Sequence, residues 1–498
     1  MTSRPVNGNR EERRIEYPMS VLKLALPGGG SLVKNSHARN NQFQLSRRAS
    51  LAWFLSLILS LVIAISALQT CAQETGTPSS PTTGSQASPA PAVSAETQKQ
   101  PTAEFRLSKE RYDKAVSYSR AGYVLHFVST AWGIVVLVAL LGWGVIAKIR
   151  DAAVKGSRNL VVQAIVFVGA LSIITGVLDL PLSMYWHWLS LRYEQSVQGW
   201  GSWFWDWSKG ELIGIVLGTI VALILYLVIR WKPRNWWLYF WFASIPLLLT
   251  LVLITPWVFD PMFNKFTPLG EKHADLVRSI EQLTEKAGMP IPKERMFLME
   301  ASAKTNQINA YVTGLGASKR VVVWDNTIKK MAPDEVLFVV GHEMGHYALG
   351  HVFKGIVFGL AGIFVALYIA YHALQWSLAR WGAKWGVPSQ QDWAALVVIL
   401  LIFNVIGFFA EPIGNSFSRT QEHAADVYGL EVTHGIIPNS NEAAAHAFQV
   451  MGELDLADPN PSPIITIWLY GHPPLAERLE FAHNYNPWGK GESPKYVK

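Results

Sequence analysis

The chain has 498 residues, of which 50% are hydrophobic and only 16% are charged, and it contains 21 tryptophans. This composition excludes an ordinary soluble multidomain enzyme and is typical of a membrane protein. The net charge of +7 does not indicate a nucleic-acid partner, because the lysines and arginines cluster beside apolar runs, where the positive-inside bias places them. The single cysteine, Cys71, excludes an internal disulfide framework and a cysteine-based zinc cluster.

The first hundred residues contain no predicted globular domain. Residues 1–46 are polar and basic without an apolar period, so we expect a disordered extension. Residues 47–72 contain a short apolar run, at 51–68, that follows two arginines and fits a secretory signal peptide as well as a first membrane span. Residues 73–103 are rich in Pro, Ser and Thr and form a linker that cannot bury a core.

Further along the chain, six runs are apolar over the roughly 20 residues that a helix needs to cross a hydrocarbon layer about 30 Å thick. They lie at 122–147, 159–181, 212–230, 236–257, 352–375 and 393–413. The first four form a transmembrane bundle within 104–257, and the last two form a pair within 352–413. The sequence therefore predicts a mainly α, polytopic membrane helix bundle of six or seven transmembrane helices, with polar regions at 258–351 and 414–498.

The order of the spans predicts where the polar regions emerge. Basic connectors at 148–158 and 230–235, together with Arg380 and Lys384, all fall on one side of the membrane. The positive-inside bias makes this side cytoplasmic and favours the periplasmic face of a bacterial inner membrane for both polar regions, although residues 101–121 are also basic and count against it. Parity alone gives the firmer result that two spans separate the polar regions, so they share a face and can share a site.

The sequence VVGHEMGHYALGH at 339–351 places two histidines and a glutamate in an apolar predicted helix. The Pro-Asp-Glu sequence at 333–335 suits a first helical turn, so the helix begins there. His342 and His346 then lie on one face, about 40° apart and one turn along, and two imidazoles can hold one ion. Glu343 lies beside them, where it can hold and deprotonate a metal-bound water. The alternative is a buried polar cluster satisfied by its own hydrogen bonds.

A catalytic zinc usually takes three protein ligands, so this site needs a third from elsewhere. On a continuous helix His351 points about 140° away from His346 and is a poor candidate. Glu422 is a better one, because it starts a second helical stretch beyond the sixth span, with Asp426 one turn on to accept a hydrogen bond from an imidazole. His423 is the alternative ligand, and a surface salt-bridge helix is the alternative for the whole segment.

With these motifs the sequence resembles the type I CAAX prenyl endopeptidases, the multi-span zinc proteases that trim isoprenylated C-termini, and their bacterial relatives. HEMGH and SRTQEHAAD match the wider family of membrane metallopeptidases. More specific are FDPMFNKFTPL at 259–269, NAYVTGLGASKRVVVWD at 309–325 and GHPPLAERL at 471–479, which occur in family order. The resemblance covers roughly residues 104–485.

The resemblance implies a fold and a set of residue roles. Transmembrane helices would enclose a large water-filled chamber, capped by a zincin-like catalytic region. One zinc ion per chain would be bound by His342, His346 and Glu422, with Glu343 as the general base. The remaining implied roles are substrate-backbone contact by Asn309, oxyanion stabilisation by His472 and support of the substrate or of that histidine by Arg478.

Two segments of the catalytic region have a further interpretation. INAYVTGL and RVVVWDNTI flank a Gly-Ala-Ser-Lys turn and predict a β-hairpin whose exposed edge pairs with an extended peptide. The alternative is a hairpin that only packs on the active-site helix. His472 precedes two prolines and has an alternative role as a cap of the following helix.

The sequence thus predicts an integral-membrane zinc endopeptidase that acts on a peptide or protein substrate, lipidated or not, within a lipid bilayer. Two alternatives stay open: a general quality-control protease without a prenyl requirement, and a non-catalytic membrane scaffold or transporter. A transporter predicts paired discontinuous helices near the middle of the membrane, and the sequence has no such pair. The oligomeric state is not predicted.

Overall fold

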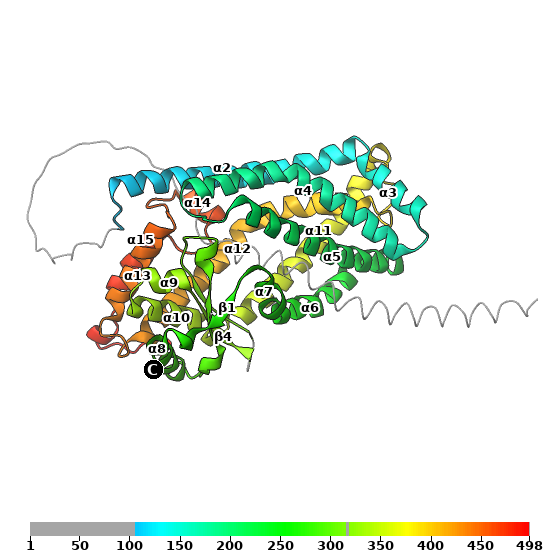
Figure 1. Ribbon diagram of the computed structural model, residues 1–498. Helices are drawn as coiled ribbons and strands as arrows, with labels where there is room; N and C mark the ends of the chain where they lie inside the picture. Colours follow the sequence, from blue (N-terminus) through cyan, green and yellow to red (C-terminus); the bar gives the residue numbers. More distant parts are fainter. Residues whose placement is uncertain (1–104, 315–317, 498) are drawn as a thin grey trace, which may run out of the picture. The chain divides into compact units, whose positions relative to one another are not determined.

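The computed structural model describes residues 105–314 and 318–497, all of which belong to one compact unit (Figure 1). The predicted extension at 1–46, the signal peptide or span at 47–72 and the linker at 73–103 lie outside the described residues.

Among the described residues, six helices are long and apolar enough to cross a membrane. They are α2 (Lys109–Gly142), α4 (Leu160–Arg192), α5 (Trp200–Trp231), α6 (Trp236–Ile254) with its extension to Phe263, α11 (His351–Trp385) and α12 (Ala395–Thr433). Each predicted apolar run falls on one of them, so the polytopic helical fold is confirmed. The predicted end of the first run at 147 is wrong, because Gly144 adopts a left-handed conformation with φ 68° and turns the chain into the short helix α3 (Val145–Gly156).

The basic connectors gather at one end of the long helices. Arg150 of α3 donates a hydrogen bond of 3.3 Å to the carbonyl of Gly386, in the connection between α11 and α12. A cavity of about 350 Å³ at this end is lined by Arg150 together with Arg158 and Arg230. Figure 1 shows α3 at the opposite end of the long helices from α8 (Ala274–Lys286), α13 (Ser440–Leu454) and α15 (Leu475–Asn484).

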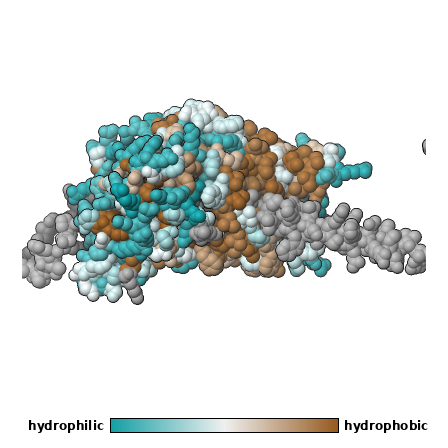
Figure 2. Space-filling model, turned by 60° about the horizontal axis from the view of Figure 1, so that its bottom comes forward, coloured by the Kyte–Doolittle hydropathy of each residue, from teal (hydrophilic) through white to brown (hydrophobic). Residues whose placement is uncertain are grey.

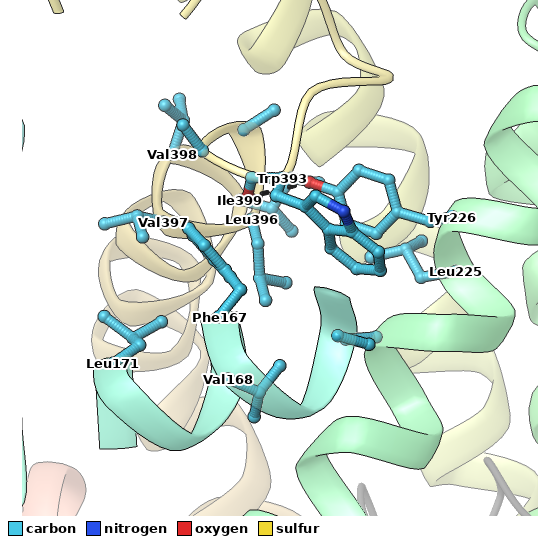
Figure 3. Close-up of a cluster of buried hydrophobic side chains, with 14 of the residues drawn as sticks. Phe167, Val168, Leu171, Leu225, Tyr226, Trp393, Leu396, Val397, Val398 and Ile399 are labelled. Carbon is cyan, nitrogen blue, oxygen red and sulfur yellow. Dashed lines mark hydrogen bonds between the residues drawn. The ribbon is translucent and has the colours of Figure 1, made fainter. Parts of the chain in front are cut away.

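The basic end is held by a buried aromatic cluster (Figure 3). Trp393, which is 2% exposed, packs between Phe167 of α4 and Tyr226 of α5, with ring centroids 6.2 and 4.3 Å away. The Trp393 indole donates to Gln163 Oε1 at 3.0 Å, and the Tyr226 hydroxyl donates to the carbonyl of Asp392 at 2.6 Å. Because lipid is as apolar as these side chains, close packing and such hydrogen bonds, rather than hydrophobic burial, hold the helices together.

The surface divides in the way that a bilayer requires. Figure 2 shows hydrophobic side chains gathered over one region and hydrophilic ones over the neighbouring region. Along α4, large apolar side chains stay exposed, among them Val161 at 47%, Ile165 at 51% and Ile173 at 59%. Exposed apolar side chains on a helix long enough to cross a membrane fit a surface that faces lipid.

The polar regions contain a four-stranded sheet in the order β1-β2-β4-β3. Its strands are β1 (Phe266–Pro268), β2 (Met296–Met299), β3 (Ala310–Thr313) and β4 (Arg320–Trp324). The predicted hairpin is confirmed, because β3 and β4 pair antiparallel, with Val312 opposite Val321. The sequence did not indicate β1 or β2, because neither is joined to its partner strand by a short turn: β1 pairs with β2, and β2 pairs with β4 in parallel, each across a long connection.

Helix α7 (Asp260–Phe263) forms the end of the fourth span, and the remaining helices of the polar regions are α9 (Asp325–Lys330), α10 (Pro333–Ala348) and α14 (Pro463–Leu469). Helix α10 is the predicted histidine-bearing helix, and it begins at Pro333 as expected. Its first turn is closed by Glu335, whose Oε2 accepts a hydrogen bond of 3.0 Å from the backbone N–H of Ala332.

Helices α10 and α12 cross at very short range through glycines. A Cβ atom added at Gly345 would lie 3.0 Å from the Cβ of Tyr428, and one added at Gly429 would lie 3.0 Å from the backbone nitrogen of His342. The prediction that Glu422 starts a separate helix is wrong, because α12 runs unbroken from the sixth span to Thr433, with Pro412 inside it. The sixth span therefore carries Glu422 directly to α10, as the parity argument requires.

Candidate metal centre

Three predicted ligands converge where α10 meets α12. The Nε2 atoms of His342 and His346 are 3.2 Å apart, and Glu422 places one carboxylate oxygen 3.2 Å from the first and the other 3.5 Å from the second. One ligand atom of each residue lies within 4.8 Å of the others. Tetrahedral zinc with bonds of about 2.0–2.1 Å spaces its ligand atoms by about 3.3 Å. The geometry therefore fits a small divalent ion.

Two further observations support the fit to a cation. The Oε2 atom of Glu422 is buried and faces Nε2 of His342 at 3.2 Å and Nε2 of His472 at 3.3 Å without a well-directed hydrogen bond to either, although a buried carboxylate oxygen needs one. Burial disfavours an imidazolium, yet the carboxylates of Asp426 and Glu422 raise the pKa of His342 to about 10. Burial lowers the pKa of His346 to about 3, which leaves its ring neutral for ligation. The site thus combines a neutral donor with a field that favours positive charge.

A second layer of polar groups orients these side chains. Asp426 is fully buried, and its Oδ1 lies 2.8 Å from Nδ1 of His342. Arg478 donates to both oxygens of the same carboxylate, at 2.9 and 2.7 Å, and its guanidinium lies over the ring of Phe448. Burial opposes the charge of Arg478, but Asp426 holds its pKa above the ordinary value. Arg478 therefore contacts the candidate ligand His342 only through Asp426.

Glu343 and His472 face the cavity beside the candidate ligands. Burial raises the pKa of Glu343 to about 7, and the backbone of Val312 in β3 hydrogen bonds to its carboxylate. The Nε2 atom of His472 lies 3.3 Å from Glu422 Oε2. Partial desolvation at the cavity wall lowers the pKa of His472, so the ring is neutral at physiological pH and can donate a hydrogen bond. The prolines after His472 precede α15, whose N-cap is Pro474 and has no side-chain capping bond.

The cavity has a volume of about 390 Å³ and is lined by His342, Glu343, Asn309, His472 and Arg478, all named from the sequence. The backbone of Asn309 is fixed by Thr327, whose hydroxyl lies 2.8 Å from its N–H and 2.6 Å from its carbonyl.

The same cavity is lined by ionisable groups that sequence reasoning missed: His126, Glu411, Asp455 and Asp458. His126 of α2 and Glu411 of α12 pair at 3.2 Å. Both lie within membrane-spanning helices, where an ionisable side chain is a functional candidate by default, and that signal was available in the sequence. Asp455 and Asp458 follow α13 in a segment without a recognisable motif.

Two other histidines are candidate ligands in the sequence, and the structure places each of them. His423 packs against Phe481, with ring centroids 4.8 Å apart, and is not part of the ligand group. The prediction that His351 points away from His346 is wrong, because α10 ends at Ala348 and Gly350 turns the chain with φ 66°. His351 then begins α11, with its Nδ1 3.1 Å from Nδ1 of His346.

A His-His-Glu group held between α10 and the membrane-spanning helix α12, beside a cavity that His342 and Glu343 line, is the arrangement expected of a multi-pass membrane metallopeptidase. Comparison with known proteins agrees: the model of peptidase family M48 matches residues 271–486, and that of the CAAX prenyl protease N-terminal region, five membrane helices, matches 92–265. The chain belongs to the M48 family of metallopeptidases. The prediction of a membrane metalloendopeptidase, similar to CAAX prenyl proteases, that acts on a peptide or protein is confirmed. The family match favours this enzyme over the alternative of a non-catalytic scaffold or transporter.

Individual relatives resemble the chain over most of its length. It is 34% identical over 368 residues to an uncharacterized metalloprotease, YhfN, of Bacillus subtilis, covering 74% of this chain and 84% of that protein. It is 26% identical over 412 residues to CAAX prenyl protease 1 of Saccharomyces cerevisiae, covering 77% and 88%. The crystal structure of S. mikatae Ste24p matches with a TM-score of 0.66 over 89% of this chain and 97% of that one, and at 22% identity this likeness is one of fold.

Proposed function

We propose that the chain is a zinc endopeptidase that binds one zinc ion through His342, His346 and Glu422. The convergence of one ligand atom from each of these three side chains on a single buried point carries the proposal. When bound, zinc supplies a Lewis acid that polarises the scissile carbonyl and acidifies water.

The chain's own residues perform the proton transfers. Glu343 takes a proton from the attacking water and delivers it to the leaving amine, and its pKa of about 7 suits both roles near neutral pH. The neutral ring of His472 donates a hydrogen bond to the carbonyl oxygen as negative charge develops there. Arg478 holds Asp426, which in turn holds the ring of His342 in the orientation for ligation.

The substrate binds as an extended peptide along β3. This strand is at the edge of the described sheet, so one side of its backbone has no strand neighbour and can receive an added strand. The hydrogen bond from Val312 to Glu343 puts this edge beside the proposed general base. Asn309 immediately precedes β3 and lines the cavity, where its amide can contact the substrate backbone.

The test of this proposal is the variant Glu343→Gln. We expect it to keep its metal and to lose nearly all peptide cleavage, measured by mass spectrometry of products from a mixed peptide pool with a chelator control. His423→Gln, a histidine on α12 outside the ligand group, should cleave as the wild type does. Undiminished cleavage by Glu343→Gln would refute the mechanism.

The prenyl requirement is a separate question. The bacterial relative of 34% identity is named only as a metalloprotease, whereas the yeast CAAX prenyl protease 1 is 26% identical. We propose general cleavage of membrane-associated peptides, with prenylated tails as one class of substrate. Cleavage rates of one peptide with and without a farnesyl group test this: comparable rates support it, and cleavage of the farnesylated form alone contradicts it.

We also propose that the basic end of the helices is cytoplasmic and the metal centre periplasmic, in a bacterial inner membrane. The gathering of Arg150, Arg158 and Arg230 at the end remote from the site supports this orientation. In a Cys71→Ser background, Lys293→Cys in the catalytic region should react with an impermeant maleimide added to spheroplasts, and Lys232→Cys should react only after lysis. The reverse pattern would invert the topology.

A further inference from the structure

The two candidate histidine ligands each have a second ring nitrogen, and each of these nitrogens has a partner. His342 turns Nε2 toward Glu422 and places Nδ1 2.8 Å from Asp426. His346 turns Nε2 toward the same point and places Nδ1 3.1 Å from Nδ1 of His351. Both imidazoles therefore offer Nε2 to a cation and Nδ1 to a neighbouring side chain. Nothing in the proposed mechanism uses His351.

A left-handed turn of the backbone produces the contact between His351 and His346. Helix α10 would carry residue 351 to the far side of its axis, but the chain leaves the helix after Ala348 and reverses through Gly350, at φ 66°. His351 is the first residue of α11 and is 6% exposed. Its ring lies edge-on to that of His346, with centroids 5.1 Å apart and planes at 74°, which suits a hydrogen bond between ring edges.

We propose that His351 is a positioning residue for the metal centre: its Nδ1 accepts the Nδ1–H of His346, which fixes the orientation and tautomer of that ring with the Nε2 lone pair toward the metal. The proposal rests on the proposed function, because it needs His346 to be a ligand. His351 itself touches neither metal nor substrate. Partners of this kind typically change metal affinity by about 10- to 100-fold.

The two positioning groups differ in charge, and this has a chemical consequence. Asp426 is a carboxylate, although Arg478 neutralises part of its charge through two hydrogen bonds. His351 is a neutral acceptor, so it orients His346 without adding negative charge to the centre. Fewer negative charges around the ion leave it a stronger Lewis acid, which favours polarisation of the scissile carbonyl.

Replacing His351 with asparagine or leucine tests the proposal, because these side chains have nearly the same shape but only asparagine can accept the hydrogen bond near the Nδ1 position. Metal affinity of the full chain, purified in detergent, is measured by competition with a chelator. We expect His351→Leu to weaken zinc binding about 10- to 100-fold, and His351→Asn to recover most of it. His423→Leu serves as the matched control and should bind zinc as the wild type does.

The visible absorption spectrum of the cobalt-substituted protein is a second measurement, and a simple loss of packing would not change it. We expect the visible absorption of the Co²⁺ form to change in His351→Leu and to stay close to wild type in His351→Asn. Equal losses in both variants, or no loss in either, would overturn the proposal. If His351→Leu does not elute as folded protein, His351→Ala takes its place with the same outcomes. A wild-type chain that binds no metal would instead refute the proposed function itself.

Discussion

The close crossing of α10 and α12 makes Gly345→Ala a sharp test of how the ligands are brought together. The added Cβ would lie 3.0 Å from the Cβ of Tyr428 and 3.2 Å from the Cα of Ala425. Ordinary carbon contacts are about 3.5–4.0 Å, so the helices must part by roughly 0.5 Å. Overpacking of this kind destabilises by about 1–3 kcal/mol, whereas Gly to Ala in an open helical site stabilises by about 0.5–1 kcal/mol. The clash should therefore outweigh the gain in helix propensity.

The same displacement should weaken the metal centre, because Glu422 lies one turn from Ala425 on the helix that would move. Functional side chains need placement to within about 0.5 Å, so we expect a lower unfolding temperature together with at least 10-fold weaker zinc binding. Both are measured on detergent-purified protein, by thermal unfolding and by chelator competition. Gly355→Ala on α11, where an added Cβ meets nothing within 4 Å, is the control: it should keep wild-type zinc binding and unfold at the wild-type temperature or slightly above it. A Gly345→Ala variant with the unfolding temperature and the zinc affinity of the wild type would refute the reasoning.

Three further predictions follow from buried groups. Asp426→Asn should weaken zinc binding about 10- to 100-fold, while Glu431→Gln, on the same helix but bonded to the C-terminal backbone, should leave metal affinity unchanged. Burial raises the pKa of Asp455 to about 7, so the folded state prefers its protonated form and loses stability as pH rises from about 4 to 7. Asp455→Asn should therefore raise the unfolding temperature relative to wild type more at pH 8 than at pH 5, and a pH-independent difference would contradict this. Trp393→Ala should lower the unfolding temperature through the aromatic cluster without changing metal affinity, and a metal-affinity loss comparable to that of Asp426→Asn would contradict this separation.

Much of the site was predictable because it depends on helical periodicity and on span parity. The spacing of His342 and His346 fixes their common face, and two intervening spans return Glu422 to the same side of the membrane. Neither inference needs tertiary detail. The hairpin of β3 and β4 was predictable for a similar reason, since its strands are adjacent in sequence and joined by a short turn.

The remaining features depend on single backbone conformations or on long-range packing. His351 reaches His346 only because Gly350 is left-handed, which a periodicity argument along one helix cannot foresee. The cavity wall formed by Asp455 and Asp458 comes from a loop placed by α13, and no local pattern specifies that placement. The single long helix α12 was split in the prediction because polarity changes at the membrane surface while the helix itself does not end.

The most direct test of the account is the metal content of the purified chain and of Glu422→Gln, measured by elemental analysis after exhaustive dialysis against zinc-free buffer. We predict one zinc per wild-type chain and far less in the variant, because two imidazoles of one helix hold the ion weakly without the carboxylate of the other. Wild-type protein without stoichiometric zinc, or a Glu422→Gln variant that retains it fully, would contradict a metal shared between α10 and α12.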